Sequence, residues 1–249
     1  MTENQSPVPE KKAPAPSASV QSLPVRSAPE PTASAEAPRA FEVSLQGISI
    51  TGVSFDSRTH RLAVADQPGG PGANWPDAKS AGSSFGGVAA VNAGFFTPEG
   101  APLGLLVSKG KKTGVINRSS SLGAGFYADG SLLRRENWSG NAAEALQSGP
   151  FLIDRGKTVG GLSDVTSSAR TFIGWDGGTR WFLARSGSCS LASLARALEG
   201  SHPGGVRSHT VLNLDGGRSS DLWISSSVQG GPVTERPLWN KPVRNFLVL

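Results

Sequence analysis

Asp215 stands in a pattern that is suited to chemistry. It follows the run Val211–Leu214, and a glycine pair, Gly216 and Gly217, comes directly after it. Alternate side chains of a strand point to opposite faces, so Asn213 and Asp215 are expected on one face. A glycine pair lets the chain turn sharply and lets the backbone approach a ligand closely. The stretch therefore indicates a carboxylate aimed into a cleft, although Asp-Gly is also a very common tight-turn dipeptide.

Three further Asp-containing segments show how common the simple turn is. They lie at residues 129–130, 154–156 and 176–178, and each separates two short apolar runs. This arrangement is typical of a tight turn between strands. Asp215 differs because two hydroxyls follow it, at Ser219 and Ser220. The pattern leaves a turn and a functional carboxylate as the two alternatives.

Asn92 ends a second apolar run and is followed by a glycine. The run Val88–Val91 suits a buried strand, and Gly94 allows another part of the chain to approach closely. Asparagine at such a position is commonly a turn former, but two strand ends of the same kind favour a shared site. A polar turn before the apolar run 151–153 adds Ser148, either as a turn residue or as a hydroxyl at the rim of that site.

Arg170 and Thr171 begin the apolar run that continues to Trp175. An arginine at the start of a strand is commonly a surface charge. Its guanidinium also suits bidentate contact with a phosphate or a carboxylate. We therefore treat Arg170 as a candidate anion-binding residue and Thr171 as a candidate hydrogen-bonding residue.

A β-rich domain is expected to position these residues. Short apolar or alternating runs, separated by glycine-containing turns, recur from residue 41 to residue 249 and predict strands. The run 41–50 changes phase at Gly47, which predicts a β-bulge. The expected fold class is α/β (α+β), with a curved mixed central β-sheet and few helices.

Three helices are predicted. The clearest spans Ser190–Gly200, because its leucines share one face, Ser190 is a good N-cap and Gly200 is a good stop signal. The segment 141–146 predicts a short helix with Asn141 as its N-cap and Glu144 as the capping-box partner. A third, poor helix is expected within residues 76–84.

Residues 1–40 differ in composition from the rest of the chain. They are rich in Pro, Ala and Ser and have too few large apolar residues to offset the entropy of ordering. They are predicted to be a disordered arm or linker, followed by one domain over residues 41–249. The arm has no continuous apolar segment of the kind found in signal peptides. No run of roughly 18 apolar residues predicts a transmembrane helix.

The formal net charge of +5 permits anionic partners. The densest basic cluster, Lys109 with Lys111 and Lys112, indicates a solvated loop, and no nucleic-acid-binding motif is present, so nucleic acid is not the expected partner. Cys189 is the single cysteine, which excludes an intrachain disulfide. No metal or other cofactor is expected: oxygen ligands near Asp215 would suit Ca²⁺, but their spacing matches no known calcium loop.

Four separated stretches together resemble the phosphodiester glycosidase family. They are VNAGFF at 91–96, QSGPFLI at 147–153, ARTFIG at 169–174 and LNLDGGRSS at 212–220. The resemblance implies an α/β fold with a curved central sheet and the hydrolysis of a sugar-1-phosphodiester, such as an N-acetylglucosamine-1-phosphodiester. It also favours an extracytoplasmic setting (periplasmic, secreted or surface). One departure is Arg218, where the family usually has a further glycine, and this residue bears on the identity of the substrate.

Cleavage at the anomeric carbon passes through a positively charged sugar, so a carboxylate must lie beside the ring and a cation beside the departing phosphate. Asp215 is the candidate carboxylate, acting as nucleophile, general base or electrostatic stabiliser, and Arg170 is the candidate cation. Hydrogen bonds to the substrate are expected from side chains and backbone around them: Asn92, Gly94, Ser148, Thr171, Asn213, Gly216, Gly217, Ser219 and Ser220.

Two questions stay open at the level of the sequence. A second carboxylate is not evident, and its weak candidates are Glu99, Asp164 and Asp221. The protein could also be a non-catalytic module of the same fold that binds a carbohydrate or a phosphoglycan. In that case, exposed tryptophans would offer stacking faces, and the candidates are Trp175, Trp223 and Trp239.

Overall fold

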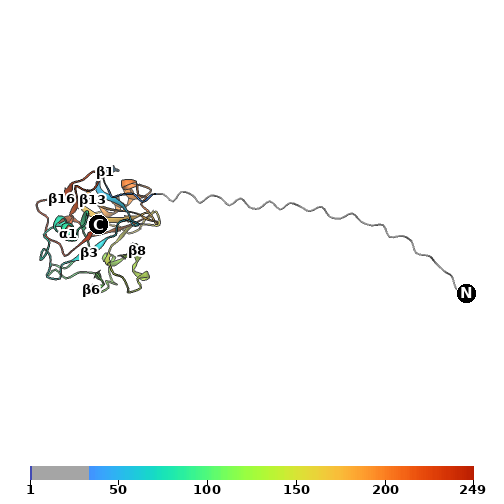
Figure 1. Ribbon diagram of the computed structural model, residues 1–249, viewed down its shortest axis with the longest axis horizontal. Coiled ribbons are helices and arrows are strands. Elements are labelled where there is room, and N and C mark those ends of the chain that lie inside the picture. The colour runs from blue at the N-terminus through green and yellow to red at the C-terminus, as the bar shows by residue number, and fades with distance from the viewer. Residues whose placement is uncertain (2–33) are drawn as a thin grey trace. The chain divides into compact units, whose positions relative to one another are not determined.

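The computed structural model describes Met1 and residues 34–249 (Figure 1). Residues 35–249 form one compact unit. Most of the predicted arm, residues 2–33, lies outside the described residues, so its disorder stays a prediction. The first strand begins at Arg39, two residues before the expected start of the domain.

Three antiparallel sheets make up the compact unit. The seven-stranded sheet has the order β1 (Arg39–Leu45), β2 (Ile48–Asp56), β13 (Arg180–Cys189), β12 (Ser168–Trp175), β14 (Thr210–Asn213), β10 (Phe151–Asp154) and β11 (Lys157–Thr158). The second sheet has the order β16 (Val233–Glu235), β15 (Leu222–Ile224), β4 (Ala89–Asn92), β17 (Asn245–Val248) and β3 (Ala63–Asp66). The third has the order β6 (Lys111–Thr113), β5 (Leu106–Ser108), β9 (Ala145–Ser148), β7 (Gly125–Ala128) and β8 (Ser131–Arg134). In Figure 1 its strands β6 and β8 are labelled in the lower part of the domain.

The seven-stranded sheet is buried on both faces. Consecutive residues of its central strands are apolar, and their side chains point alternately to one face and to the other. Ile173 and Leu183 belong to the main core, which also contains Val91 of β4 and Leu146 of β9, so the three sheets share one core. Their neighbours Phe172 and Phe182 point to the other face. There they pack with Leu194 and Leu198 of helix α2 (Leu191–Leu198).

The two α-helices of residues 34–249 lie where the sequence predicts them. Helix α2 has the expected N-cap, since the Ser190 side chain accepts from the Ser193 amide and the Ser193 side chain bonds back to Ser190. Helix α1 (Ala78–Ser84) begins after Asp77, whose carboxylate accepts from the Ser80 amide. Neither helix is long and apolar enough to cross a membrane.

Tight turns join neighbouring strands as predicted. Asp129 and Gly130 connect β7 to β8, and both have positive φ angles. The same holds for Arg155 and Gly156 between β10 and β11. The predicted bulge at Gly47 is wrong. Gln46 (φ 49°) and Gly47 (φ 80°) are instead the two central residues of a hairpin, with Leu45 paired to Ile48, so the phase change marks a reversal of the chain.

The predicted helix at 141–146 is also wrong. Residues from Ala145 onward form strand β9, and no capping box forms at Asn141. The Glu144 carboxylate accepts hydrogen bonds from the amide of Val64 in β3 (2.6 Å) and from the amide of Lys109 in the turn between β5 and β6 (2.9 Å). These long-range bonds hold the segment extended and override its local helical propensity.

The expected fold class is confirmed, since strands dominate and helices are few. Two details differ from the expectation. The strands are divided among three sheets, and every ladder between the described strands is antiparallel rather than mixed. The candidate residues can therefore meet although they are far apart in the sequence, because these sheets bring distant segments side by side.

Candidate active site

Asn92, at the end of β4, connects the second sheet to the seven-stranded sheet. Its Nδ2 donates to the Asp215 carbonyl (2.7 Å). Its Oδ1 accepts from the Thr171 hydroxyl (2.7 Å) and from the Asp221 amide (3.0 Å). Both Asn92 and Thr171 are fully buried. Asn92 therefore fixes the position of the Asp215 backbone rather than presenting its own side chain to a ligand.

Asp215 lies one residue beyond Leu214, where the chain leaves β14. Its amide donates to the Ala93 carbonyl (2.8 Å), which ties the two predicted strand ends together. Its carboxylate accepts from the Gly216 amide (2.8 Å) and from the Ser219 side chain. Burial raises the pKa of Asp215 to about 6, although these two hydrogen bonds act in the opposite direction. The residue is only partly buried, so the carboxylate can still meet a ligand.

Arg170 lies on the opposite face of β12 from Thr171, as expected for neighbours on one strand. Its guanidinium donates to the carbonyls of Cys189 (3.1 Å) and Thr166 (2.6 Å). No carboxylate within residues 34–249 forms an ion pair with it, and burial lowers its pKa. A Cβ built on Gly216 would lie 3.6 Å from the Arg170 Cδ, so the arginine flanks the turn that follows Asp215. The structure thus brings a cation without an ion-pair partner to this turn.

Close packing explains the glycine after Asp215. A Cβ on Gly216 would lie 2.9 Å from the Ala169 carbonyl oxygen, which is too close for any other residue. Gly217 adopts φ 62° at the start of a short 3-10 helix, Gly217–Ser219. Both glycines are required by the fold of the turn. The turn holds Ser219 against the Asp215 carboxylate.

Several of the other predicted contacts are used within the protein. The Ser148 hydroxyl donates to the Asn213 carbonyl (2.9 Å), and Asn213 Nδ2 donates to the Gly149 carbonyl (3.0 Å). The Gly94 amide donates to the side chain of Asn245. These residues support the site from within. Among the predicted site residues, two buried side-chain atoms nevertheless lack a partner within the described part of the chain: the Oδ1 of Asn213 and the Oγ of Ser220.

The three weak candidates for a second carboxylate are engaged elsewhere. The Asp221 carboxylate accepts from the Ala78 amide (2.9 Å) at the start of α1 and pairs with Arg236 (2.8 Å), while burial raises its pKa. The Asp164 carboxylate accepts from Ser190, the N-cap of α2. Glu99 is exposed, and a hydrogen bond from the Thr97 side chain lowers its pKa. None of these carboxylates contacts Asp215.

An ion pair that the sequence did not single out lies one strand away from Thr171. Arg185 of β13 is the cross-strand partner of Thr171, so their side chains share a face. The Arg185 guanidinium donates to Glu235 of β16 (2.6 Å), and the Thr51 hydroxyl donates to the other oxygen of Glu235 (2.7 Å). Arg185 could have been found from the sequence by the criterion used for Asp215, since it is a charged residue directly after a buried apolar run.

Arg218 holds a neighbouring loop in place. Its Nε and one terminal nitrogen both donate to the Trp239 carbonyl (3.3 and 3.2 Å), and the Lys241 amide donates back to the Arg218 carbonyl (3.1 Å). The Trp239 side chain is 67% exposed. Trp175 and Trp223 are packed against the core instead, so of the three candidate tryptophans Trp239 is the one free to stack on a ligand.

No group of three or more His, Cys, Asp or Glu side chains in residues 34–249 is arranged to hold a metal ion. The absence of a metal or other cofactor stays a prediction. Within residues 34–249, the chemistry available around the Asp215 turn consists of one partly exposed carboxylate, one arginine without an ion-pair partner, and nearby hydroxyls and amides. Such a set is suited to a ligand that has both hydroxyl groups and a negative charge.

Comparison with known proteins identifies the family of the chain. The sequence profile of the phosphodiester glycosidases matches residues 85–249, and the chain belongs to that family. The match includes all the candidate residues named above for the Asp215 turn. No curated protein matches the chain in sequence.

Solved structures share the fold. The catalytic domain of zebrafish N-acetylglucosamine-1-phosphodiester alpha-N-acetylglucosaminidase, auto-inhibited by its pro-peptide, is 15% identical, with a TM-score of 0.60 over 86% of this chain and 82% of that chain. A hypothetical protein from Synechocystis is 16% identical, with a TM-score of 0.56 over 84% of this chain and 61% of that one. A Burkholderia pseudomallei protein predicted to be exported is 12% identical, with a TM-score of 0.53 over 81% and 74%. At these identities the likeness establishes the fold.

Proposed function

We propose that the protein hydrolyses a sugar-1-phosphodiester at the bond between the anomeric carbon and the phosphate oxygen. The products are the free sugar and a phosphomonoester. The observation that carries this proposal is the Asp215 turn, which holds a partly exposed carboxylate with a pKa of about 6 and is flanked at Gly216 by Arg170, an arginine with no carboxylate partner within residues 34–249. Membership of the phosphodiester glycosidase family supports the same reaction class. The zebrafish relative suggests an N-acetylglucosamine-1-phosphodiester as the first substrate to try.

Asp215 acts as the general base in this proposal. A base works best when its pKa lies near the working pH, and burial places Asp215 there. The carboxylate takes a proton from a water molecule as the water oxygen forms its bond to the anomeric carbon. The bond from this carbon to the phosphate oxygen breaks at the same time, and its electron pair leaves with the phosphate.

Arg170 stabilises the departing phosphate. A phosphomonoester has a second pKa of about 6, so it leaves readily without a proton from a second carboxyl group. A cation that meets the growing negative charge can take the place of that acid. This division of roles accounts for the engagement of Glu99, Asp164 and Asp221 elsewhere. The guanidinium now donates to two carbonyls, and we propose that phosphate replaces one of these contacts.

The loop that carries Trp239 forms the substrate-binding rim. Arg218 belongs to the Asp215 turn and holds the Trp239 carbonyl, so the backbone that carries the exposed indole is held close to that turn. An indole face suits the apolar face of a sugar or an aromatic aglycone. The exposed Arg218 and Lys241 place positive charge on the same rim, which fits a carbohydrate or phosphoglycan substrate. The exported relative favours an extracytoplasmic location for this protein too.

The test measures the release of free sugar from UDP-N-acetylglucosamine and from a panel of sugar-1-phosphodiesters. Asp215→Asn should lower the rate by about 10²- to 10³-fold, as expected for the loss of one charged catalytic group. The matched control is Asp176→Asn, which changes the other Asp-Gly-Gly turn at the opposite end of β12 and should keep the wild-type rate. Equal rates for wild type and Asp215→Asn would refute the role of Asp215.

The second candidate function is a non-catalytic module that binds carbohydrate or phosphoglycan. The exposed Trp239 favours it, because stacking alone gives binding without any catalytic group. Calorimetry separates the two functions. Binding of a panel member without release of sugar, in a wild-type protein that is fully folded, would select the module over the hydrolase.

A further inference from the structure

A groove of about 450 Å³ is lined by residues of both the seven-stranded sheet and the third sheet. Its walls come from the short 3-10 helix Ser121–Gly123, the end of β8, the start of β10, the segment 159–163 and the start of α2. A ligand can reach its larger apolar side chains that are partly exposed, which are Leu122, Pro150, Val159, Leu162 and Leu191. Small-molecule sites are commonly clefts of roughly 300–1,000 Å³ with largely apolar walls.

The charged side chains that line the groove already have partners. Arg134 pairs with Asp154, and its guanidinium lies over the Phe151 ring, 6.0 Å from the centroid. Arg135 pairs with Glu136 (3.8 Å). Among the described residues, the groove therefore has no unmatched charge. The part of a ligand that enters it should be apolar and uncharged, because a charged group would lose its hydration there without gaining a partner.

Arg170 connects the groove to the Asp215 turn. Its stem lies beside that turn, since a Cβ on Gly216 would be 3.6 Å from the Arg170 Cδ. Its guanidinium donates to the carbonyls of Thr166 (2.6 Å) and Cys189 (3.1 Å). Both carbonyls belong to chain segments that also line the groove within three residues of them. The guanidinium is therefore held by a wall of the groove, while the stem flanks the Asp215 turn.

This wall is formed before any ligand arrives. The Ala192 amide of α2 donates to the Ser163 carbonyl (3.1 Å). The Ser190 hydroxyl donates to the carboxylate of Asp164 (2.5 Å), the next residue of the same segment. These bonds attach the segment to the start of α2. A wall that is already ordered lowers the entropy cost of binding.

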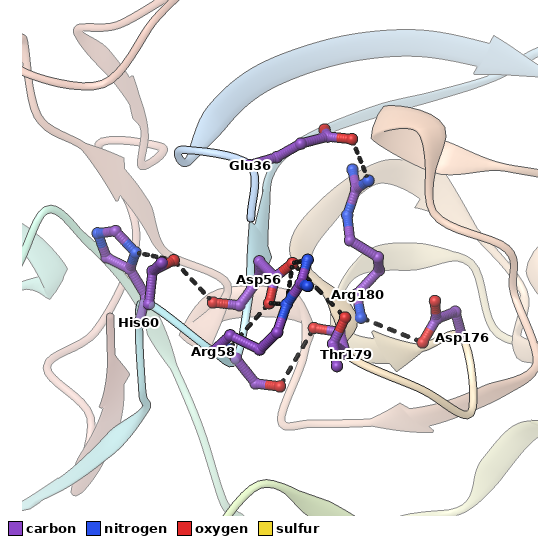
Figure 2. A network of polar contacts seen from close by, with 9 residues as sticks. Glu36, Asp56, Arg58, His60, Asp176, Thr179 and Arg180 are labelled. Atoms are coloured by element: carbon purple, nitrogen blue, oxygen red, sulfur yellow. Dashed lines mark hydrogen bonds and ion pairs between the residues drawn. The ribbon is translucent and has the colours of Figure 1, made fainter. Parts of the chain in front are cut away.

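The arginines at the opposite end of the seven-stranded sheet are paired (Figure 2). Arg58 pairs with Asp56 (2.6 Å), and Arg180 pairs with Glu36 (2.5 Å). A carboxylate thus neutralises each of these cations, whereas Arg170 forms no ion pair within residues 34–249. An anionic group is therefore accommodated better at Arg170 than at the arginines of the other end.

We propose that the groove receives the aglycone of the substrate and that this aglycone is an apolar alcohol, such as an alkyl alcohol, esterified to the phosphate. The inference rests on the proposed function. A diester of this kind carries its negative charge next to its apolar group, as Arg170 lies next to the groove. The phosphate meets the Arg170 guanidinium, and the aglycone lies against Leu162 and Leu191. The sugar then extends toward the Asp215 turn and the rim at Trp239.

Calorimetry with alkyl phosphates tests the inference, because these phosphomonoesters are the products that the reaction would leave in the site. Methyl and hexyl phosphate differ by five CH₂ groups. Full burial of a CH₂ group tightens binding by about fourfold, and half of this free energy in an open groove makes hexyl phosphate bind about 30-fold tighter to the full wild-type chain. Leu162→Ala removes part of the apolar wall and should lower this ratio of affinities at least about threefold. Binding of methyl phosphate reports whether the variant is folded.

Leu45→Ala is the matched control. Leu45 is also a half-buried leucine packed against the same core as Leu162, but it lies on β1 and does not line the groove, so the ratio should keep its wild-type value. Equal affinities of the wild type for the two phosphates would overturn the inference. A ratio that Leu162→Ala leaves unchanged would also overturn it, and a loss in Trp239→Ala instead would place the chain at the rim. A protein that binds hexyl phosphate as expected but releases no sugar from any diester would contradict the proposed function alone.

Discussion

Asp215→Asn should make the protein more stable at neutral pH while it lowers the rate of hydrolysis. Burial raises the pKa of Asp215 from 3.8 to about 6, so the folded chain holds this proton more tightly than the unfolded chain does. The protonated carboxyl is therefore favoured by folding, and its contribution to stability is lost as the pH rises from about 4 through about 6. Asparagine keeps an oxygen for the Gly216 amide and carries no charge, which removes this penalty.

The size of the effect follows from the two pKa values. With 1.36 kcal/mol for each pH unit, ionisation of Asp215 destabilises the fold by about 1 kcal/mol at pH 4.5 and by about 3 kcal/mol at pH 7.5. Asp215→Asn should therefore gain about 2 kcal/mol more at pH 7.5 than at pH 4.5. Partial exposure of the residue makes this an upper value.

Urea denaturation followed by tryptophan fluorescence measures the difference at the two pH values. Asp176→Asn serves as the control, since it removes a carboxylate from the other Asp-Gly-Gly turn. An Asp215→Asn protein that is less stable than wild type at pH 7.5, or whose gain is the same at both pH values, would refute the reasoning. It would mean that the carboxylate is stabilised as an anion in the folded protein.

Four further outcomes are expected. The rate of hydrolysis should rise with pH through about 6 and then level off, because Asp215 must be ionised to act as a base; a rate that falls over this range would make it an acid. Arg170→Gln should lower kcat by about 10²-fold in steady-state assays. Trp239→Ala should raise KM and leave kcat unchanged, since the exposed indole only binds. Thr171→Val should lower the free energy of unfolding by about 1 kcal/mol in urea, because Asn92 loses one hydrogen bond.

The sequence predicted the strand ends better than it predicted the direction of side chains. Asn92 and Asp215 do meet, as the repeated pattern suggested, since alternation and glycine placement are local properties. The separation of Arg170 from Thr171 onto two faces also follows from strand geometry. The role of Asn92 as a link between sheets could not be foreseen, because it depends on how two sheets pack and on which polar atoms burial leaves to be satisfied.

The wrong prediction of a helix at residues 141–146 also results from contacts between distant parts of the chain. Residues 141–146 have a helical composition and a plausible N-cap, but Glu144 bonds to Val64, 80 residues earlier in the chain. Arg185 and Glu235 escaped notice because their pairing joins strands of different sheets, 50 residues apart. Contacts of this range depend on topology, which short sequence patterns do not encode.

The position of β17 sets the order in which the site can be completed during synthesis. β4 lies between β15 and β17, and both partners follow it in the chain by more than 100 residues. Asn245, which holds the Gly94 amide, is made 151 residues after it. At about 5–20 residues per second, a ribosome takes about 8–30 s to cover that interval. Both edges of the β4 strand are unpaired until β15 is made, and one edge stays unpaired until β17 is made, so the nascent chain must avoid wrong strand pairing during this time.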